Sequence, residues 1–281
     1  MKTQILNLNN WPRCILVLCN FGFVEFLQIV LCNWYFIFSA KPIKYKTADS
    51  MTKKETAVLY DDIAKPKTLS RNADPCTAKG CKWPKSGSYV YVPYFISESY
   101  SQKERSIIIR GLQSFNVSTC IRFVPWKCGD RDFIYIENKD GCWSYVGRQD
   151  GGQYISLNKG GCLHQSVVQH EVLHALGFNH EQVRSDRDTY VRILFENILP
   201  DLKYNFEKIE TNNLGTPYDF NSVMEYRNDA ASKNGKPTIV AKCNPNLKFG
   251  NAKEMSANDI LRIKRLYECC EYPVDNYTVS N

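Results

Sequence analysis

The chain after residue 71 carries apolar residues in two periodic patterns, one typical of strands and one typical of helices. Strands are predicted where short runs rich in β-branched and aromatic residues occur, at 89–96, 133–136 and 153–157. Helices are predicted where apolar residues recur at helical spacing, at 103–115, 167–176 and 257–267. The second helix should stop at Gly177, because glycine readily adopts the positive φ that ends a helix. We therefore expect a globular domain over 72–281.

The first 71 residues lack these patterns and divide into two segments. Residues 1–40 contain a long apolar tract preceded by basic residues, which we interpret as a signal peptide. A membrane anchor is the alternative, disfavoured because Glu25 in the middle of the tract would be costly in hydrocarbon. A third interpretation is that this terminus is not encoded by the mature transcript. Residues 41–71 are polar and Lys-rich and end in Arg71, which suits a propeptide with an exposed basic cleavage site.

Composition and cysteine usage restrict the class of protein. Hydrophobic residues make up 43% and charged residues 23% of the chain, ordinary values for a soluble globular protein. The net charge of +7 is not clustered into a stripe that would bind nucleic acid. The 12 cysteines include no Cys-x-x-Cys pair, which indicates disulfides in an oxidising compartment. Glycosylation acceptors at Asn116 and Asn276 agree with a secreted, extracellular protein, or one stored in a secretory granule.

One short segment combines the residue types of a catalytic metal site. On a helix, His170 and His174 lie one turn apart on the same face, so both imidazoles can reach one metal ion. Glu171 stands beside the first ligand, where it can take a proton from a water at the metal. Gly177 lets the chain turn back, so that His180 can supply a third nitrogen. Three neutral nitrogens leave a coordination position open, which is typical of catalytic zinc.

Chance is the alternative explanation of this pattern, because a histidine on an apolar helix is more often a packed or solvated side chain than a ligand. The chain has only 4 histidines, and all but one fall at the required positions, with the glutamate and the glycine also in place. We therefore expect one zinc ion in each subunit. The remaining histidine, His164, has no such context and is expected to be a surface or structural residue.

The residues that follow resemble the metzincin group of zinc endopeptidases and, within it, the astacin family. Residues 181–191 are similar to the astacin signature at nearly every position. Residues 222–226 resemble the family's Met-turn. This resemblance implies that Met224 lies beneath the zinc, and that Tyr226 can ligate the metal or swing away to stabilise the oxyanion. Glu225 stands where the family usually has histidine, and we expect this difference to alter specificity or pH dependence more than catalysis.

The resemblance covers about residues 76–269 and implies both a fold and a set of disulfides. The implied fold is α+β, the two-subdomain metzincin catalytic domain, with a twisted N-terminal sheet backed by helices above the zinc helix and an irregular C-terminal half below. Residues 141–148 are similar to the family's edge strand, along which an extended peptide can lie. The implied disulfides are Cys142–Cys162, Cys120–Cys269 and Cys76–Cys81. The last is typical of six-cysteine astacins, a subgroup that includes hatching enzymes.

Three cysteines of the domain are left over by this pairing, namely Cys128, Cys243 and Cys270. Because three is an odd number, at least one of them is free or is paired outside the domain. A Cys128–Cys243 disulfide is one option. Another is that Cys270 takes the place of Cys269 in the long-range bridge.

The resemblance also implies that the protein is made as a zymogen. Astacin pro-segments place an aspartate on the zinc, and the residues around Asp62 resemble that switch, with Asp61 where glycine is expected. The alternative is that both are solvated acidic residues of a linker. Cleavage after Arg71 by an activating protease would free Asn72. The family pattern places this new N-terminus near Glu181, which gives Glu181 a structural role.

Together these observations predict a secreted zinc metalloendopeptidase, with an extended polypeptide as substrate and Glu171 and Tyr226 as catalytic residues. The six-cysteine resemblance favours a stand-alone, monomeric protease that acts on an egg-envelope glycoprotein during hatching. One alternative is a protease that processes matrix or precursor proteins, a kind that usually carries further Cys-rich domains. The other is a catalytically silent zinc-binding module, which should have lost a zinc ligand or Glu171.

Overall fold

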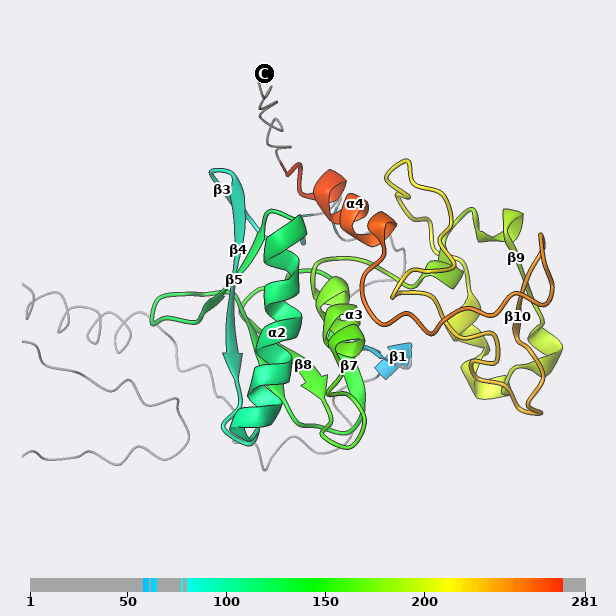
Figure 1. The fold of residues 1–281 in the computed structure, drawn as a ribbon, viewed down its shortest axis with the longest axis horizontal. Helices are drawn as coiled ribbons and strands as arrows, with labels where there is room; N and C mark the ends of the chain where they lie inside the picture. Colours follow the sequence, from blue (N-terminus) through cyan, green and yellow to red (C-terminus); the bar gives the residue numbers. More distant parts are fainter. Residues whose placement is uncertain (1–57, 61, 65–76, 78–79, 270–281) are drawn as a thin grey trace, which may run out of the picture. The chain divides into compact units, whose positions relative to one another are not determined.

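The computed structural model describes residues 58–60, 62–64, 77 and 80–269, which form an α+β structure as the sequence predicted (Figure 1). Eight of the described strands form one sheet in the order β1-β2-β7-β8-β6-β4-β3, with β5 also paired to β4. These strands are β1 (Val58–Tyr60), β2 (Ile63–Ala64), β3 (Lys85–Ser86), β4 (Tyr89–Ile96), β5 (Ile121–Pro125), β6 (Phe133–Glu137), β7 (Cys142–Tyr145) and β8 (Gly152–Leu157). The α-helices of the described residues are α2 (Gln102–Ser118), α3 (Gln165–Ala175) and α4 (Ala257–Leu266).

The strands predicted from apolar runs are all present as β4, β6 and β8. In β4, Val90 and Val92 are fully buried while Tyr91 between them is 45% exposed, because successive side chains of a strand point to opposite faces. Strand β5 was not predicted. It is short, and the charged side chain of Arg122 interrupts its apolar run, so a single-sequence pattern gives it little weight.

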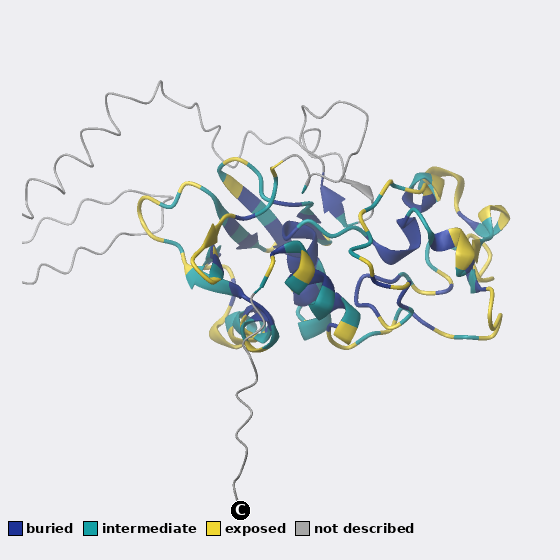
Figure 2. Ribbon diagram, turned by 90° about the horizontal axis from the view of Figure 1, so that it is seen from above, coloured by how far each residue is buried: buried dark blue, intermediate teal, exposed yellow. Residues whose placement is uncertain are grey.

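Helices α2 and α3 lie side by side on one face of the sheet (Figure 1). Helix α2 begins at a capping box, in which the Ser101 side chain accepts from the Glu104 backbone N–H and the Glu104 carboxylate accepts from the Ser101 N–H. The two helices approach closely at Gly111, where a Cβ atom would lie 2.5 Å from Cγ1 of Val168. The main core therefore lies between the sheet and these helices, and Figure 2 shows exposed residues concentrated on loops and outer helix faces.

The chain after α3 forms the irregular C-terminal half that was expected. It contains a two-stranded sheet of β9 (Val191–Ile193) and β10 (Ile239–Ala241) with a second, smaller apolar cluster around Phe206. Helix α4 returns to the main core, where Ile263 is fully buried. Short 3-10 helices account for most of the remaining regular structure of this half: Glu181–Val183, Arg187–Thr189, Phe195–Asn197 and Pro200–Phe206.

Strand β7 lies within the segment expected to be the edge strand, but its edge is occupied by the chain's own N-terminal part. Strand β2 pairs with β7 in parallel, with Ile63 opposite Ser144 and Ala64 opposite Tyr145. The backbone N–H of Ser144 also donates to the carbonyl of Asp62, at 2.8 Å. Residues 62–64 therefore fill the position along which an extended substrate was expected to lie.

Two of the disulfides implied by the family resemblance are present. Cys120, just before β5, is joined to Cys269 after α4, a sequence separation of 149 residues. Cys142 in β7 is joined to Cys162, in the loop before α3, a separation of 20 residues. The first bridge ties the end of the described chain to the sheet, and the second fixes β7 beside α3.

The remaining cysteines correct one expectation. Cys128 and Cys243 are free and exposed, so the Cys128–Cys243 bridge considered from the sequence is wrong. They lie in separate parts of the fold, one after β5 and the other after β10, which sequence spacing alone cannot reveal. Cys81 is disulfide-bonded, but its expected partner Cys76 lies outside the described residues, as does Cys270.

Several sequence predictions fall outside the described residues. They are the signal peptide or anchor in 1–40, the cleavage site between Arg71 and Asn72, the neighbouring Asp61, and the acceptor Asn276. Among the residues that the structure does describe, no helix combines the length and apolar character needed to cross a membrane.

A buried ion-pair network joins α4 to the chain that follows α3. Arg262 donates to both carboxylate oxygens of Glu181, at 2.7 and 2.9 Å. Arg184 lies 3.3 Å from the same carboxylate, which also accepts from the backbone N–H of Asp219 at 2.7 Å. All four residues are buried. The structural role that the family resemblance gave to Glu181 is consistent with this position.

Replacing Cys120 and Cys269 together by serine should lower the free energy of unfolding by about 4 kcal/mol, because a bridge across so long a segment restricts the unfolded chain strongly. Denaturant unfolding without reductant measures the loss. Cys128→Ser is the control, because it alters an exposed free thiol and should change the free energy by less than about 0.5 kcal/mol. A double variant as stable as the control would contradict the expectation.

Arg262→Ala should lower the free energy of unfolding by about 3 kcal/mol, because it leaves the buried carboxylate of Glu181 with only part of its ion pairing. Arg227→Ala is the matched control. Arg227 also forms an ion pair, with Asp229, but both side chains are largely exposed, so its removal should cost less than about 1 kcal/mol. Equal losses in the two variants, measured by urea unfolding, would show that the buried network contributes no more to stability than an exposed ion pair.

Candidate active site

The candidate site is built on the C-terminal end of α3, where the helix ends abruptly. Gly177 has φ of +105°, and its N–H donates to the carbonyl of His174 at 2.8 Å. The next N–H, of Phe178, donates to Leu173 at 3.0 Å, which completes a Schellman motif. The positive φ favours glycine, and a Cβ atom at position 177 would also displace the Thr77 side chain, whose Cγ2 would lie 2.5 Å away.

This turn brings three imidazoles together. The Nε2 atom of His170 lies 3.1 Å from Nε2 of His174 and 3.2 Å from Nε2 of His180. The Nδ1–H groups of the first two rings donate to backbone carbonyls, of Val223 at 2.8 Å and of Phe178 at 2.7 Å. These bonds fix the ring orientation and leave the Nε2 lone pairs directed at one point. Burial lowers the pKa of His174 to about 4, which keeps that ring neutral, as a metal ligand must be.

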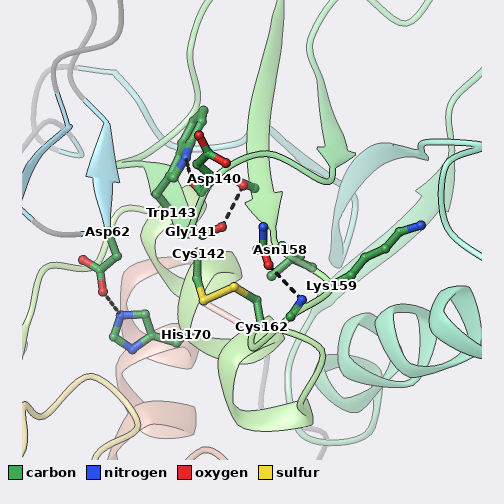
Figure 3. The surroundings of a disulfide bond; sticks show 12 residues. Asp62, Asp140, Gly141, Cys142, Trp143, Asn158, Lys159, Cys162 and His170 are labelled. Atoms are coloured by element: carbon green, nitrogen blue, oxygen red, sulfur yellow. Dashed lines mark hydrogen bonds and ion pairs between the residues drawn. A yellow bond between two sulfur atoms is a disulfide. The ribbon is translucent and has the colours of Figure 1, made fainter. Parts of the chain in front are cut away.

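The carboxylate of Asp62 points at the imidazole of His170 (Figure 3) and lies close to the other two rings. Its Oδ2 is 2.9 Å from Nε2 of His170, and its Oδ1 is 3.0 Å from Nε2 of His180 and 3.6 Å from Nε2 of His174. Burial would raise the pKa of this carboxyl group, but its close contacts with the imidazoles of His180 and His170 hold it well below its usual range. Asp62 is therefore an ionised fourth group of the cluster.

The donor set fits a zinc ion. One ligand atom from each of the three histidines and from Asp62 lies within 4.8 Å of all the others. Three imidazole nitrogens and one carboxylate oxygen are ligands that zinc accepts in tetrahedral geometry. With Asp62 in place, this set is complete. Without it, the three histidines would leave one position open, which is the arrangement of a catalytic site.

Glu171 faces the cleft beside this centre. The cleft has a volume of about 410 Å³, and its walls include Asp62, His170 and Glu171. Glu171 is 1% exposed, and burial together with the charge of Asp62 raises the pKa of its carboxyl group well above the usual range. A carboxyl group with a raised pKa, close to the ligands but not one of them, is suited to exchange protons during a reaction.

The two Met-turn residues singled out from the sequence also lie at the centre. The ring of Tyr226 is 4.5 Å from that of His180, measured between centroids. Met224 is buried, and its carbonyl accepts from the N–H of Glu181 at 3.0 Å, which ties the Met-turn to the residue after the third histidine. The backbone of Tyr226 is in turn covered by Gly250, where a Cβ atom would approach its carbonyl carbon to 2.4 Å.

Glu225 is more deeply enclosed than the sequence suggested. It contributes to the wall of the same cleft but is only 6% exposed. Burial raises the pKa of its carboxyl group well above the usual range, and the neighbouring Tyr218 hydroxyl offsets this only in part. The difference from the family's usual histidine thus places an acidic group in the cleft wall.

Two residues noted in the sequence lie away from the centre. His164 is exposed and precedes α3 as its N-cap residue, as expected for a histidine outside the metal site. Asn116, the candidate glycosylation acceptor, lies in the last turns of α2 and is partly buried. Sequence reasoning missed Val223, whose backbone carbonyl accepts from His170, and Asp259, whose carboxylate accepts from the backbone N–H of Val223. A local signal existed only for the helix-capping role of Asp259, because Ser256 followed three residues later by an acidic residue is a capping pattern.

Comparisons with known proteins agree with this geometry. A family model described as Astacin, a family of peptidases, matches residues 77–268. High choriolytic enzyme 1 of Oryzias latipes is 47% identical over 214 residues, which cover 75% of this chain and 78% of that protein. Low choriolytic enzyme of the same fish is 43% identical over 215 residues, covering 75% and 78% of the two proteins.

A solved structure leads to the same family. The structure of high choriolytic enzyme 1, a hatching enzyme zinc-protease from medaka, matches with a TM-score of 0.68 and 48% identity, covering 71% of this chain and all of that chain. Because the family match includes all three histidines, Glu171 and the Met-turn, this chain belongs to the astacin family of peptidases, whose members are zinc-dependent metalloendopeptidases.

Proposed function

We propose that this protein is a secreted astacin endopeptidase, made as a zymogen, that hydrolyses egg-envelope glycoproteins. The observation that carries the zymogen proposal is the position of Asp62, whose carboxylate lies among the three histidine Nε2 atoms while β2 occupies the edge of β7. One short segment thus fills both the metal position and the substrate position. In this proposal residues 41–71 are the propeptide and 72–281 the catalytic domain.

His170, His174 and His180 would hold the zinc ion in the active enzyme. When bound, zinc supplies a Lewis acid that polarises the scissile carbonyl and lowers the pKa of water. Glu171 takes a proton from the attacking water and returns it to the leaving amine, a role supported by its place in the cleft. Tyr226, packed against His180, donates from its hydroxyl to the oxyanion.

Activation requires that the pro-segment leaves the cleft. Cleavage after Arg71 by another protease would separate the segment containing Asp62 from the catalytic domain. The strand edge of β7 would then be open for an extended polypeptide to pair with, by the backbone hydrogen bonds that β2 now makes. The new N-terminus at Asn72 would settle near Glu181, beside the network with Arg262.

The egg-envelope substrate is proposed from the similar proteins. Two of them are named choriolytic enzymes, and the solved one is described as a hatching enzyme. Secretion is supported by the disulfides Cys120–Cys269 and Cys142–Cys162, since disulfides persist in oxidising compartments. We propose a monomer. The processing of matrix or precursor proteins is the alternative substrate class, whereas the silent-module alternative is disfavoured because all three histidines and Glu171 are in place.

Glu171→Ala should lower kcat by about 10²–10⁴-fold on a broad protein substrate, because it removes the group that transfers protons. The assay uses chain cleaved to begin at Asn72, with isolated egg-envelope protein as a second substrate. A chelator should abolish the activity, and added zinc should restore it. Glu207→Ala, which alters an exposed acidic residue, is the control and should keep full activity. Full activity in Glu171→Ala would refute the mechanism, and failure to cleave egg-envelope protein would refute the substrate.

Asp62→Ala should raise the activity of the uncleaved chain by about ten- to one-hundred-fold, because it removes the carboxylate that would fill the open zinc position. Losing a charged contact of this kind costs the bound pro-segment about 1.5–3 kcal/mol, and about 1.4 kcal/mol corresponds to a tenfold change. Hydrolysis of a short fluorogenic peptide measures the change. Asp140→Ala is the matched control, because Asp140 is an exposed acidic residue just before β7. Equal activity in the two variants would contradict the proposed inhibition.

A further inference from the structure

Hydrogen bonds to one buried carboxylate, that of Asp259, hold the Met-turn in place. This residue is 2% exposed and lies in the first turn of α4. Its Oδ2 accepts from the backbone N–H groups of Ser256, at 2.9 Å, and of Val223, at 3.0 Å. Its Oδ1 accepts from the hydroxyl of Ser222 at 2.7 Å. Only the bond from Ser256 belongs to the helix cap, so two of the three bonds serve the Met-turn.

These contacts continue to a zinc ligand as a chain of hydrogen bonds. The Ser222 hydroxyl that donates to Asp259 accepts from the N–H of Met224 at 3.0 Å. The other end of the same peptide group, the carbonyl of Val223, accepts from Nδ1–H of His170 at 2.8 Å. A carboxylate is thus linked through a hydroxyl and one peptide group to the imidazole whose Nε2 faces the metal position.

We propose that Asp259 and Ser222 are positioning residues for the zinc ligand His170, acting through the Val223–Met224 peptide group. A metal-binding histidine usually donates its second N–H to a carboxylate or carbonyl, which fixes the ring and raises the basicity of the ligand nitrogen. Here the acceptor is a carbonyl whose own N–H end is bonded, through Ser222, to a buried negative charge. Hydrogen bonds in such a chain polarise and strengthen one another.

The arrangement singles out His170 among the ligands. His174 donates from Nδ1 to the carbonyl of Phe178, in the Schellman turn that ends α3. No carboxylate contact to that turn is found among the described hydrogen bonds.

The inference rests on the same zinc site as the proposed function, so its test measures metal binding and not proteolysis. Full-length, uncleaved protein is stripped of metal, and its zinc affinity is measured by competition with a chromophoric chelator. Ser222→Ala interrupts the chain at the hydroxyl, and Asp259→Asn removes the negative charge with little change of shape. Both should weaken zinc binding about ten- to one-hundred-fold. The visible absorption of the cobalt-substituted protein should also change in both variants, because the position of one ligand changes.

Ser256→Ala is the matched control. It removes the side-chain cap of α4, in which the Ser256 hydroxyl accepts from the N–H of Asp259, and also the donation from that hydroxyl to the carboxylate of Asp219. It leaves the chain to His170 intact. It should lower the Tm about as much as Ser222→Ala does, yet keep zinc affinity within about twofold of the parent. Asp259→Asn bears on the inference only if it folds, whereas Ser222→Ala is expected to fold and tests the inference alone.

Two results would overturn the inference. One is unchanged zinc affinity and cobalt absorption in Ser222→Ala, because the chain would then have only a structural role. The other is equal weakening in Ser222→Ala and Ser256→Ala, because general destabilisation would then explain both. Neither depends on whether the protein is a protease, so an inactive cleaved enzyme with the expected zinc affinities would refute the proposed function and leave this inference standing.

Discussion

The termination of α3 at Gly177 is the constraint on which the rest of the site depends. Two histidines on one helix face can approach a metal ion, but the third can join them only if the chain reverses direction within a few residues. The Schellman turn makes that reversal, and its positive φ at position 177 strongly favours glycine. After Gly177 the reversed chain is fixed at Glu181, whose N–H donates to the carbonyl of Met224 in the Met-turn and whose carboxylate binds Arg262 of α4. The three imidazoles therefore belong to a rigid frame, and metal binding has little conformational entropy to overcome.

The same frame would explain how, in the proposed zymogen, one short segment holds the protein inactive. Strand β2 aligns with β7 through backbone hydrogen bonds, and this alignment carries the Asp62 side chain to the point where the histidines converge. The backbone pairing of β2 with β7 sets the position of the segment, and the Asp62 carboxylate supplies the negative charge at the histidines. The two contacts act together, so neither needs to be strong alone. Substrate would use the same strand edge once the segment leaves. In this account the pro-segment and the substrate occupy the same strand edge, one before activation and the other after it.

Much of this could be predicted from the sequence, because the relevant signals are local. The spacing of His170 and His174, the glycine that ends the helix, and the apolar runs of β4, β6 and β8 each depend on a few neighbouring residues. Contacts between distant segments left no such signal. The pairing of Ile63 with Ser144, and the approach of Asp259 to the Met-turn, are decided by packing of the whole chain. The Cys128–Cys243 bridge was wrong for the same reason, since counting cysteines says nothing about which of them meet.

The central claim is that Asp62 completes a zinc site formed by the three histidines in the uncleaved chain. Anomalous diffraction at the zinc edge, from crystals of the uncleaved protein, tests it most directly. The account predicts one zinc ion bound by Nε2 of His170, His174 and His180 and by a carboxylate oxygen of Asp62, each at about 2.0–2.2 Å. A zinc ion bound by the histidines with Asp62 turned away from it, or a zinc ion bound elsewhere in the chain, would contradict the account.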